Sequence, residues 1–345
     1  MSRFFLASIL ACAFLATGAG ADEPKGLREA LERGDFPKTS AVIVIRAGKP
    51  IYEGYFGDGG AEVLHNTRSA TKSVTSLAVG LAIADGRIAS VKQPAFALLN
   101  DLAPFKNDSP EKQAITIEDL LTMSSALDCN DDDDASPGNE DRMHEQQNWT
   151  RWAVDLPTMP GYKRDARGLG PSRYCTVGAV LLGQIVQRAV GMPVDRYIEQ
   201  RLFTPLGIRQ WRWFRSPSGE AMTGGGLELR ARDLAKLAWM VVDHGKWERA
   251  EIVPAAWIEQ ALTVRRTAFP GFNYGYLFWQ HEYSTPCGKA TGWFMSGNGG
   301  NAILAFRELD SAVVIARTNY NTRGMHQQTT AMLEKHILPS LMCDR

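Results

Sequence analysis

The sequence lacks a net charge and, beyond its first residues, a long hydrophobic run. Its 345 residues include 38 basic and 38 acidic side chains, so the formal net charge is zero. Such a balance gives no electrostatic footprint for nucleic acid or for an anionic membrane. No stretch after residue 21 is long and apolar enough to span a bilayer. With 44% apolar residues, the composition is typical of a globular protein with a substantial core.

The first 21 residues have the pattern of a signal peptide. Arg3 precedes the apolar run 4–15, and the Ala-Gly-Ala sequence at 19–21 is an A-x-A cleavage site. The run is too short for a standard spanning helix. We therefore expect export to the periplasm, with a mature chain from about Asp22. Lipid attachment at Cys12 is the alternative, but the apolar run continues beyond it.

Several common catalytic and metal-binding motifs are also absent. No serine lies in a G-x-S-x-G nucleophile elbow, which disfavours an α/β-hydrolase. The acidic run 130–134 lacks the spacing of an EF-hand, and we interpret it as a solvated loop. We predict no bound metal and no cofactor.

The cysteines match no zinc pattern either. The mature chain would keep four of them, Cys129, Cys175, Cys287 and Cys343. An even number in an oxidising compartment favours two disulfides, and four cysteines allow three pairings.

The most informative stretch that is present runs from Arg68 to Ser73. It precedes the apolar run 74–84, in which apolar residues recur at helical spacing until Gly86 ends the pattern. Ser69 and Lys72 are three positions apart, so on a helix their side chains can meet. A serine that opens a helix also places its own N–H at the positive end of the dipole, where an oxyanion would be stabilised.

The S-x-x-K spacing alone is a weak motif. Ser109 and Lys112 also match it, but in a polar segment with no apolar helix behind it, and we interpret that match as chance. For Ser69 the alternative is a helix cap beside an exposed lysine. As a nucleophile, Ser69 needs a base. Lys72 could serve if burial lowered its pKa, or a tyrosine beside it could share its proton.

The order of predicted elements indicates the fold. Strands are expected at both ends of the chain, at 41–45, 51–56, 274–281, 301–306 and 312–318. Helices are expected at 74–84, 116–123, 177–189, 195–202, 234–242 and 327–337. This order predicts an α+β fold, in which residues 22–86 and 223–345 form a mostly antiparallel sheet flanked by helices. Residues 87–222 would form an inserted all-helical domain, and a ligand is expected in the cleft between the two units.

Three motifs give the sequence a resemblance to a known family. Ser69-Ala-Thr-Lys72, Tyr174-Cys-Thr176 and Ser296-Gly-Asn-Gly-Gly300 have the order and approximate spacing of the serine β-lactamase-like superfamily. The chain most resembles its class C-type branch of esterases, D-amino-acid peptidases and 6-aminohexanoate-dimer hydrolases. Similar supporting stretches lie at 120–125, 202–208, 224–227, 232–234 and 274–276, so the resemblance covers about residues 36–340.

The resemblance implies a role for each motif residue. Ser69 would be the nucleophile, Lys72 its activating partner, and Tyr174 the general base or the relay that protonates the leaving group. The oxyanion hole would use the N–H of Ser69 and one from the edge that contains Gly297 and Asn298, with Asn298 the expected donor. The implied reaction is formation of an acyl-enzyme followed by its hydrolysis.

Two positions depart from the family pattern. Thr176 stands where the second motif usually has an asparagine that binds substrate, and Met295 stands where the third motif has a lysine or histidine. A cation there would hold the carboxylate of a penicillin or a peptide C-terminus. Its absence favours an esterase or amidase over the alternatives of a β-lactamase or D,D-peptidase, although an arginine elsewhere could replace it. A non-catalytic binding module is the third alternative.

The resemblance also implies a disulfide and a type of partner. Cys129 follows a segment that approaches the same cleft in the family, so a Cys129–Cys175 bond would hold the loop of Tyr174. By elimination, Cys287–Cys343 is a weaker second pair. The expected partner is a small-molecule ester or amide substrate and not a nucleic acid, and the oligomeric state stays open.

Overall fold

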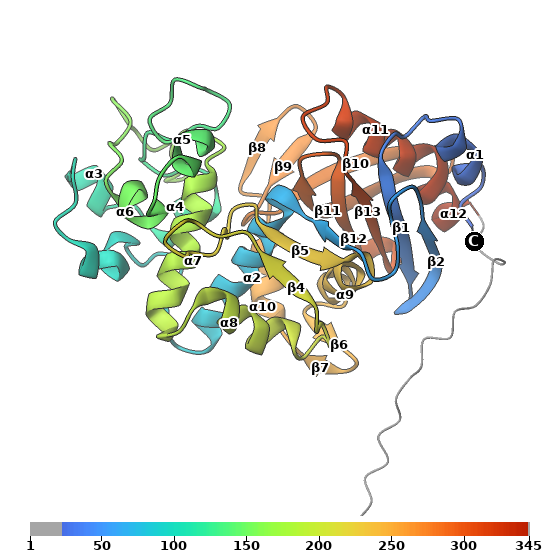
Figure 1. Cartoon of the computed structure of the whole chain (residues 1–345), viewed down its shortest axis with the longest axis horizontal. Coiled ribbons are helices and arrows are strands. Elements are labelled where there is room, and N and C mark those ends of the chain that lie inside the picture. The colour runs from blue at the N-terminus through green and yellow to red at the C-terminus, as the bar shows by residue number, and fades with distance from the viewer. Residues whose placement is uncertain (1–22, 344–345) are drawn as a thin grey trace, which may run out of the picture.

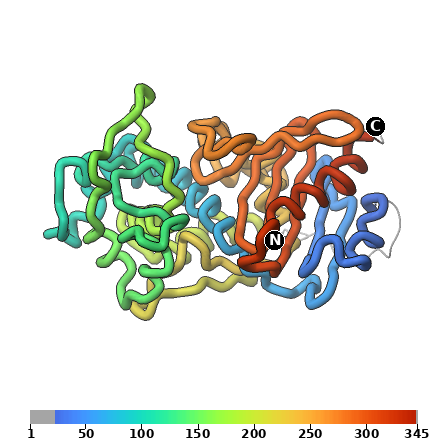
Figure 2. The backbone as a smooth tube through the Cα atoms, turned by 90° about the horizontal axis from the view of Figure 1, so that it is seen from above, coloured from blue at the N-terminus to red at the C-terminus, as the bar shows by residue number. Residues whose placement is uncertain are grey.

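The computed structural model of the chain describes residues 23–343, so the expected signal peptide and Cys12 lie outside the described residues. Eight strands form one antiparallel sheet in the order β2-β1-β13-β12-β11-β10-β9-β8 (Figure 1). The strands β1 and β13, which come first and last in the sequence, are hydrogen-bonded neighbours. They bring the blue and red ends of the chain into one unit (Figure 2).

The described residues form these elements. The large sheet contains β1 (Thr39–Arg46), β2 (Lys49–Tyr55), β8 (Arg266–Phe269), β9 (Phe272–Tyr274), β10 (Trp279–Thr285), β11 (Gly288–Gly297), β12 (Asn301–Phe306) and β13 (Ser311–Arg317). Two small sheets pair β3 (Leu64–Asn66) and β4 (Trp211–Trp213) with β5 (Leu227–Arg230), and β6 (Lys246–Trp247) with β7 (Ala250–Glu251). The α-helices are α1 (Leu27–Glu32), α2 (Thr71–Ala84), α3 (Pro110–Gln113), α4 (Ile117–Leu121), α5 (Glu140–His144), α6 (Trp149–Val154), α7 (Thr176–Val190), α8 (Val194–Ile198), α9 (Ala231–Val242), α10 (Ala255–Ala261), α11 (Met325–Met332) and α12 (Leu338–Met342). Short helices of other pitch are η1 (Arg68–Ala70), η2 (Phe96–Leu102), η3 (Glu199–Phe203), η4 (Arg307–Leu309) and η5 (Leu333–Ile337).

The large sheet is buried on both faces. Along β1, Val42 and Val44 pack in one hydrophobic cluster with α1, α11 and α12, whereas Ile43 and Ile45 pack in another with α2, α9 and α10. Successive side chains of a strand point to opposite faces, so an unbroken apolar strand serves both clusters at once. The expected α+β class, an antiparallel sheet flanked by helices, is confirmed.

Helix α2 lies in the middle of the molecule. Its residues from Thr71 to Ala82 are all buried, as the apolar run predicted. Gly80 allows α10 to approach closely, because a Cβ atom there would lie only 2.3 Å from the ring of Trp257. Beyond the helix, Gly86 has a left-handed backbone with a φ of 67°, and the N–H of Arg87 donates to the carbonyl of Ala82 at 2.9 Å. The predicted helix and its stop are confirmed.

Most other predicted elements are confirmed, with one clear error. The hairpin at β1–β2 and the helices at α7 and α9 form as expected. The predicted single strand 274–281 is wrong, because β9 ends at Tyr274 and β10 begins at Trp279. Leu277 between them has a φ of 60°, and its backbone bonds to Leu121 of α4 instead of to a sheet partner. Tertiary contact with the helical region overrides the local strand pattern there.

Helices α3 to α8 lie to one side of the large sheet, in both views (Figures 1 and 2). We propose that residues 87–222 are the inserted helical domain, although β4, at its C-terminal end, pairs with β5 beyond it. Among residues 23–343, no single helix is long and apolar enough to cross a membrane, whereas α7 together with the segment Val194–Phe203 passes that test only as a pair bent by 77°.

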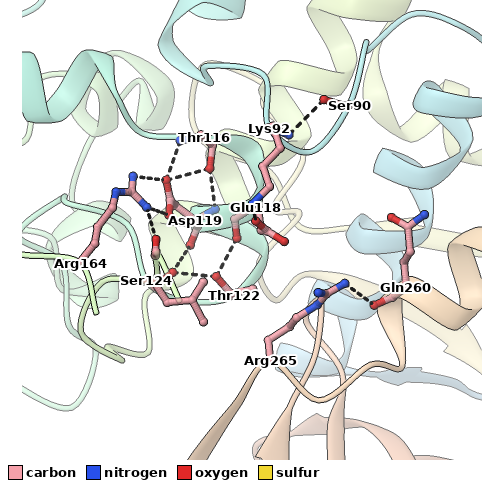
Figure 3. Close-up of polar contacts among 12 residues, drawn as sticks. Ser90, Lys92, Thr116, Glu118, Asp119, Thr122, Ser124, Arg164, Gln260 and Arg265 are labelled. Atoms are coloured by element: carbon pink, nitrogen blue, oxygen red, sulfur yellow. Dashed lines mark hydrogen bonds and ion pairs between the residues drawn. The ribbon is translucent and has the colours of Figure 1, made fainter. Parts of the chain in front are cut away.

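A polar network holds α4 in the helical region (Figure 3). Asp119, only 1% exposed, accepts hydrogen bonds at 2.8 Å from both the backbone N–H and the hydroxyl of Thr116, which completes the expected capping box. Arg164 pairs with both carboxylate oxygens of Asp119. Nearby, Glu118 binds Lys92 and the hydroxyl of Tyr276, and so links α4 to the β9–β10 turn.

We expect Asp119→Ala to lower the free energy of unfolding by about 3 kcal/mol, because it removes one partner of a buried, hydrogen-bonded ion pair. The matched control is Asp101→Ala, which breaks the exposed Asp101–Arg188 pair and should change stability by less than about 1 kcal/mol. Urea unfolding of both variants measures the difference. Equal losses would show that the network around α4 contributes no more than a surface ion pair.

Candidate active site

The structure brings Ser69 and Lys72 together as predicted. Ser69 lies in η1, directly before α2, and the Nζ atom of Lys72 donates to its Oγ atom at 3.0 Å. Arg68, just before Ser69, has a φ of 50°, a left-handed conformation that is uncommon for a non-glycine residue. This sharp turn aims the serine outward, and Thr67 supports it by donating to the carbonyl of Leu227 at 2.8 Å.

Lys72 is a buried cation. It is 1% exposed, donates to the carbonyl of Gly224 at 2.6 Å, and lies 4.9 Å from the centre of the Tyr174 ring. Burial lowers the pKa of Lys72, but its interactions with Tyr174, Glu140 and Asp131 raise the pKa by more. The net pKa lies above the ordinary value of 10.5. Lys72 is therefore a charged hydrogen-bond donor at neutral pH. The sequence allowed two bases for Ser69, a neutral Lys72 or a tyrosine that shares the proton of Lys72, and the structure favours the tyrosine.

The sequence did not identify two carboxylates beside this lysine. Asp131, which we had assigned to a solvated loop, turns inward and accepts from the N–H of Thr176 at 2.7 Å, whereas the next three aspartates are exposed. Glu140 accepts from the Thr176 hydroxyl at 3.3 Å, and the charges of His144 and Lys72 hold the pKa of Glu140 low despite its burial. Neither carboxylate belongs to a recognisable motif.

Tyr174 is held from two directions. Its carbonyl accepts from the N–H of Asp131 at 2.8 Å, and its ring stacks on Trp279 with 6.1 Å between centroids. The next residue forms the expected Cys129–Cys175 disulfide, with 5.5 Å between Cα atoms. The Cys287–Cys343 disulfide is also present. Both pairings from the sequence are confirmed.

Gly297 and Asn298 lie across the site from the lysine. A Cβ atom on Gly297 would meet the carbonyl of Thr67 at 2.2 Å, so only glycine lets the end of β11 come this close to η1. The Asn298 side chain exchanges hydrogen bonds with Asn321 at 2.6 and 2.9 Å. Among residues 23–343, the backbone N–H groups of Ser69 and Asn298 donate to no protein acceptor.

The two departures from the motif pattern are both buried. Thr176 has no exposed surface and its side chain contacts Glu140, so its influence on a ligand would pass through that carboxylate. Met295 is 2% exposed and belongs to the apolar cluster under α2. The place of the third-motif cation is therefore filled by core packing.

A cleft of about 670 Å³ opens over Ser69. Asn298 and Glu140 line it, together with Arg68 and Phe214. Phe214 is 54% exposed and supplies an apolar wall. A serine oxygen on a charged lysine, facing an open cleft with unoccupied backbone donors, has the arrangement required for acyl transfer.

The family model of the β-lactamases matches residues 27–337. This chain belongs to the β-lactamase family. The curated 6-aminohexanoate-dimer hydrolase of Paenarthrobacter ureafaciens is 26% identical over 230 residues, which are 65% of this chain and 57% of that protein. The chain thus aligns with little more than half of the length of this curated relative.

Solved structures of other proteins have a similar fold. A D-stereospecific amidohydrolase from Streptomyces gives a TM-score of 0.68 at 16% identity, covering 90% of this chain and 98% of its own. EstCE1, described as a hydrolase with promiscuous acyltransferase activity, gives a TM-score of 0.70 at 17% identity. The match covers 90% of this chain and 97% of EstCE1. At such low identities the likeness shows the fold alone, and the roles of individual residues have to come from the geometry above.

The two disulfides of this β-lactamase-family protein should differ in effect. Replacing Cys129 and Cys175 by alanine is expected to destabilise the fold by about 2–5 kcal/mol and to lower kcat, because the bond holds Tyr174. Replacing Cys287 and Cys343, at the far end of β11, should lower stability with kcat kept. Thermal unfolding and steady-state kinetics well below both transitions measure this. The same kcat for both double variants would argue against a role of the first disulfide in positioning Tyr174.

Proposed function

We propose that the chain is an exported serine hydrolase that cleaves an ester or amide bond through an acyl-enzyme on Ser69. The observation that carries this proposal is the 3.0 Å hydrogen bond from the buried, charged Lys72 to the Ser69 oxygen. The names of three similar proteins support a hydrolytic reaction. They are a 6-aminohexanoate-dimer hydrolase, a D-stereospecific amidohydrolase and a hydrolase with promiscuous acyltransferase activity.

In the first step, the Ser69 Oγ atom attacks the substrate carbonyl carbon and its proton passes to Tyr174. Lys72 cannot accept that proton, because its raised pKa keeps it charged. Its charge instead stabilises the phenolate of Tyr174. The oxygen of the tetrahedral intermediate would bind the free N–H groups of Ser69 and Asn298.

In the second step, the carbon–leaving-group bond breaks and Tyr174 returns the proton to the departing oxygen or nitrogen. Water then attacks the acyl carbon, again giving its proton to Tyr174, and Ser69 is released with its own proton restored. No metal is needed at any point. Glu140 and Asp131 balance the buried charge of Lys72 while the proton moves.

Export is supported by the signal-like pattern of residues 1–21 and by the two disulfides, which favour an oxidising compartment. Periplasmic location follows as part of the same proposal.

A fluorophosphonate probe tests the nucleophile. We expect one covalent adduct per molecule on Ser69, found by peptide mass spectrometry and lost in Ser69→Ala. The matched control is Ser109→Ala, which removes the other S-x-x-K serine; Ser109 caps α3 by accepting from the N–H of Lys112 at 3.1 Å and should not react. A folded protein without an adduct on Ser69, at excess probe, would favour the binding module.

The protonation of Lys72 predicts the alkaline side of the pH profile. Because its pKa lies above 10.5, kcat/KM for a stable amide should not fall until the pH exceeds about 10, where Lys72 loses the charge that supports Tyr174. Lys72→Met should lower kcat/KM by about 10²–10⁴-fold at neutral pH. An alkaline loss centred near pH 8 in the unmodified enzyme would instead indicate a lysine that works as a neutral base.

A further inference from the structure

Arg68 has a guanidinium group that no protein oxygen satisfies. Within residues 23–343, its side chain makes no hydrogen bond and no ion pair, and its Nε atom is buried without a partner. The group lies 4.1 Å from the centre of the Tyr320 ring, which supports it from one side. An arginine has five donors in a fixed fork, and leaving them unpaired beside a buried surface is costly.

The other arginines of the cleft differ from Arg68. Arg212 pairs with Glu228, and Arg215 pairs with Asp195 and donates to the carbonyl of Gly219. Both charges are therefore compensated within the protein. Arg68 is the arginine of this cleft whose charge the described residues leave open.

The position of Arg68 ties it to the reaction centre. It immediately precedes Ser69, and its backbone is left-handed, with a φ of 50°. Asn298 and Asn321, which carry amide groups, line the same cleft. The planar guanidinium fork matches the geometry of a carboxylate, which accepts two parallel N–H bonds.

We infer that Arg68 binds a carboxylate of the substrate, and so takes over the role of a cation that Met295 cannot fill. This inference rests on the proposed function, because it names the substrate class of the same site: esters or amides that carry a carboxylate a few bonds from the scissile carbonyl. Arg68 is then a specificity residue, and the experiment below distinguishes a carboxylate on the acyl half of the substrate from one on the leaving half.

The test compares matched esters. p-Nitrophenyl glutarate monoester and p-nitrophenyl pentanoate differ by a carboxylate in place of a methyl group on the acyl half. 3-Carboxyphenyl pentanoate and phenyl pentanoate differ by a carboxylate in place of a hydrogen atom on the leaving half. We expect the enzyme to prefer the anionic member of one pair. Arg68→Gln should lower that preference, measured as the ratio of kcat/KM values, by about 10- to 100-fold, mainly through KM.

Two further variants separate binding from structural effects. Arg68→Lys keeps the charge without the fork and should retain part of the preference. Arg212→Gln removes a cleft charge that is already paired and should change the ratio far less. If Arg68→Gln lowers kcat/KM equally for all four substrates, the role of Arg68 is only to shape η1. If Arg212→Gln changes the preference as much as Arg68→Gln does, the general charge of the cleft is responsible. Either result would overturn the inference.

A binding measurement keeps the inference testable apart from the reaction. Calorimetry on Ser69→Ala with glutaric acid monoanilide and pentananilide, with and without Arg68→Gln, needs no turnover. If Ser69→Ala binds the anionic anilide more tightly and Arg68→Gln abolishes this difference, the inference is supported even when none of the esters is cleaved. Failure to cleave the esters would count against the proposed function alone. Equal affinities for both anilides, with ester cleavage intact and no preference in either ester pair, would overturn the inference and leave the proposed function standing.

Discussion

The buried positive charge of Lys72 is the constraint on which the site depends. An ammonium group that is 1% exposed is stable only if negative groups and hydrogen-bond acceptors surround it. The structure supplies these from three parts of the chain: the carbonyl of Gly224, the inward-facing Asp131 and Glu140, and Tyr174. The groups that make the charge tolerable include Tyr174, whose ring centre lies 4.9 Å from the Nζ atom of Lys72.

The second constraint is the close approach of β11 to η1. Gly297 has no room for a Cβ atom against the Thr67 carbonyl, so the end of β11 lies directly against the start of η1. The large sheet therefore provides half of the site and the start of α2 the other half. The helical region supplies Tyr174 and the carboxylates, so the cleft exists only where these parts meet.

Much of the fold followed from local patterns. The hairpin β1–β2, the helices α2, α7 and α9, and the capping box at Thr116 have strong local signals, and each is present. The strand predicted at 274–281 was wrong because a run of apolar and aromatic residues fits a strand pattern even where the chain turns, as it does at Leu277. Its backbone bonds to Leu121 of α4, and its carbonyl accepts from the Ser73 hydroxyl, so the decisive partners are 156 or more positions away.

The sequence by itself determined the nucleophile motif and the order of the three motifs, because fixed spacing on one helix and family order are properties of the chain. The four cysteines alone left three pairings open, and the structure decided between them. Only the tertiary structure decided that Lys72 stays charged, that Asp131 and Glu140 lie near it, and that the side chain of Arg68 finds no partner among the described residues. The reason is physical. Protonation and ion pairing depend on which distant groups are brought within a few ångströms in a water-poor site, and such distances are set by packing and not by position along the chain.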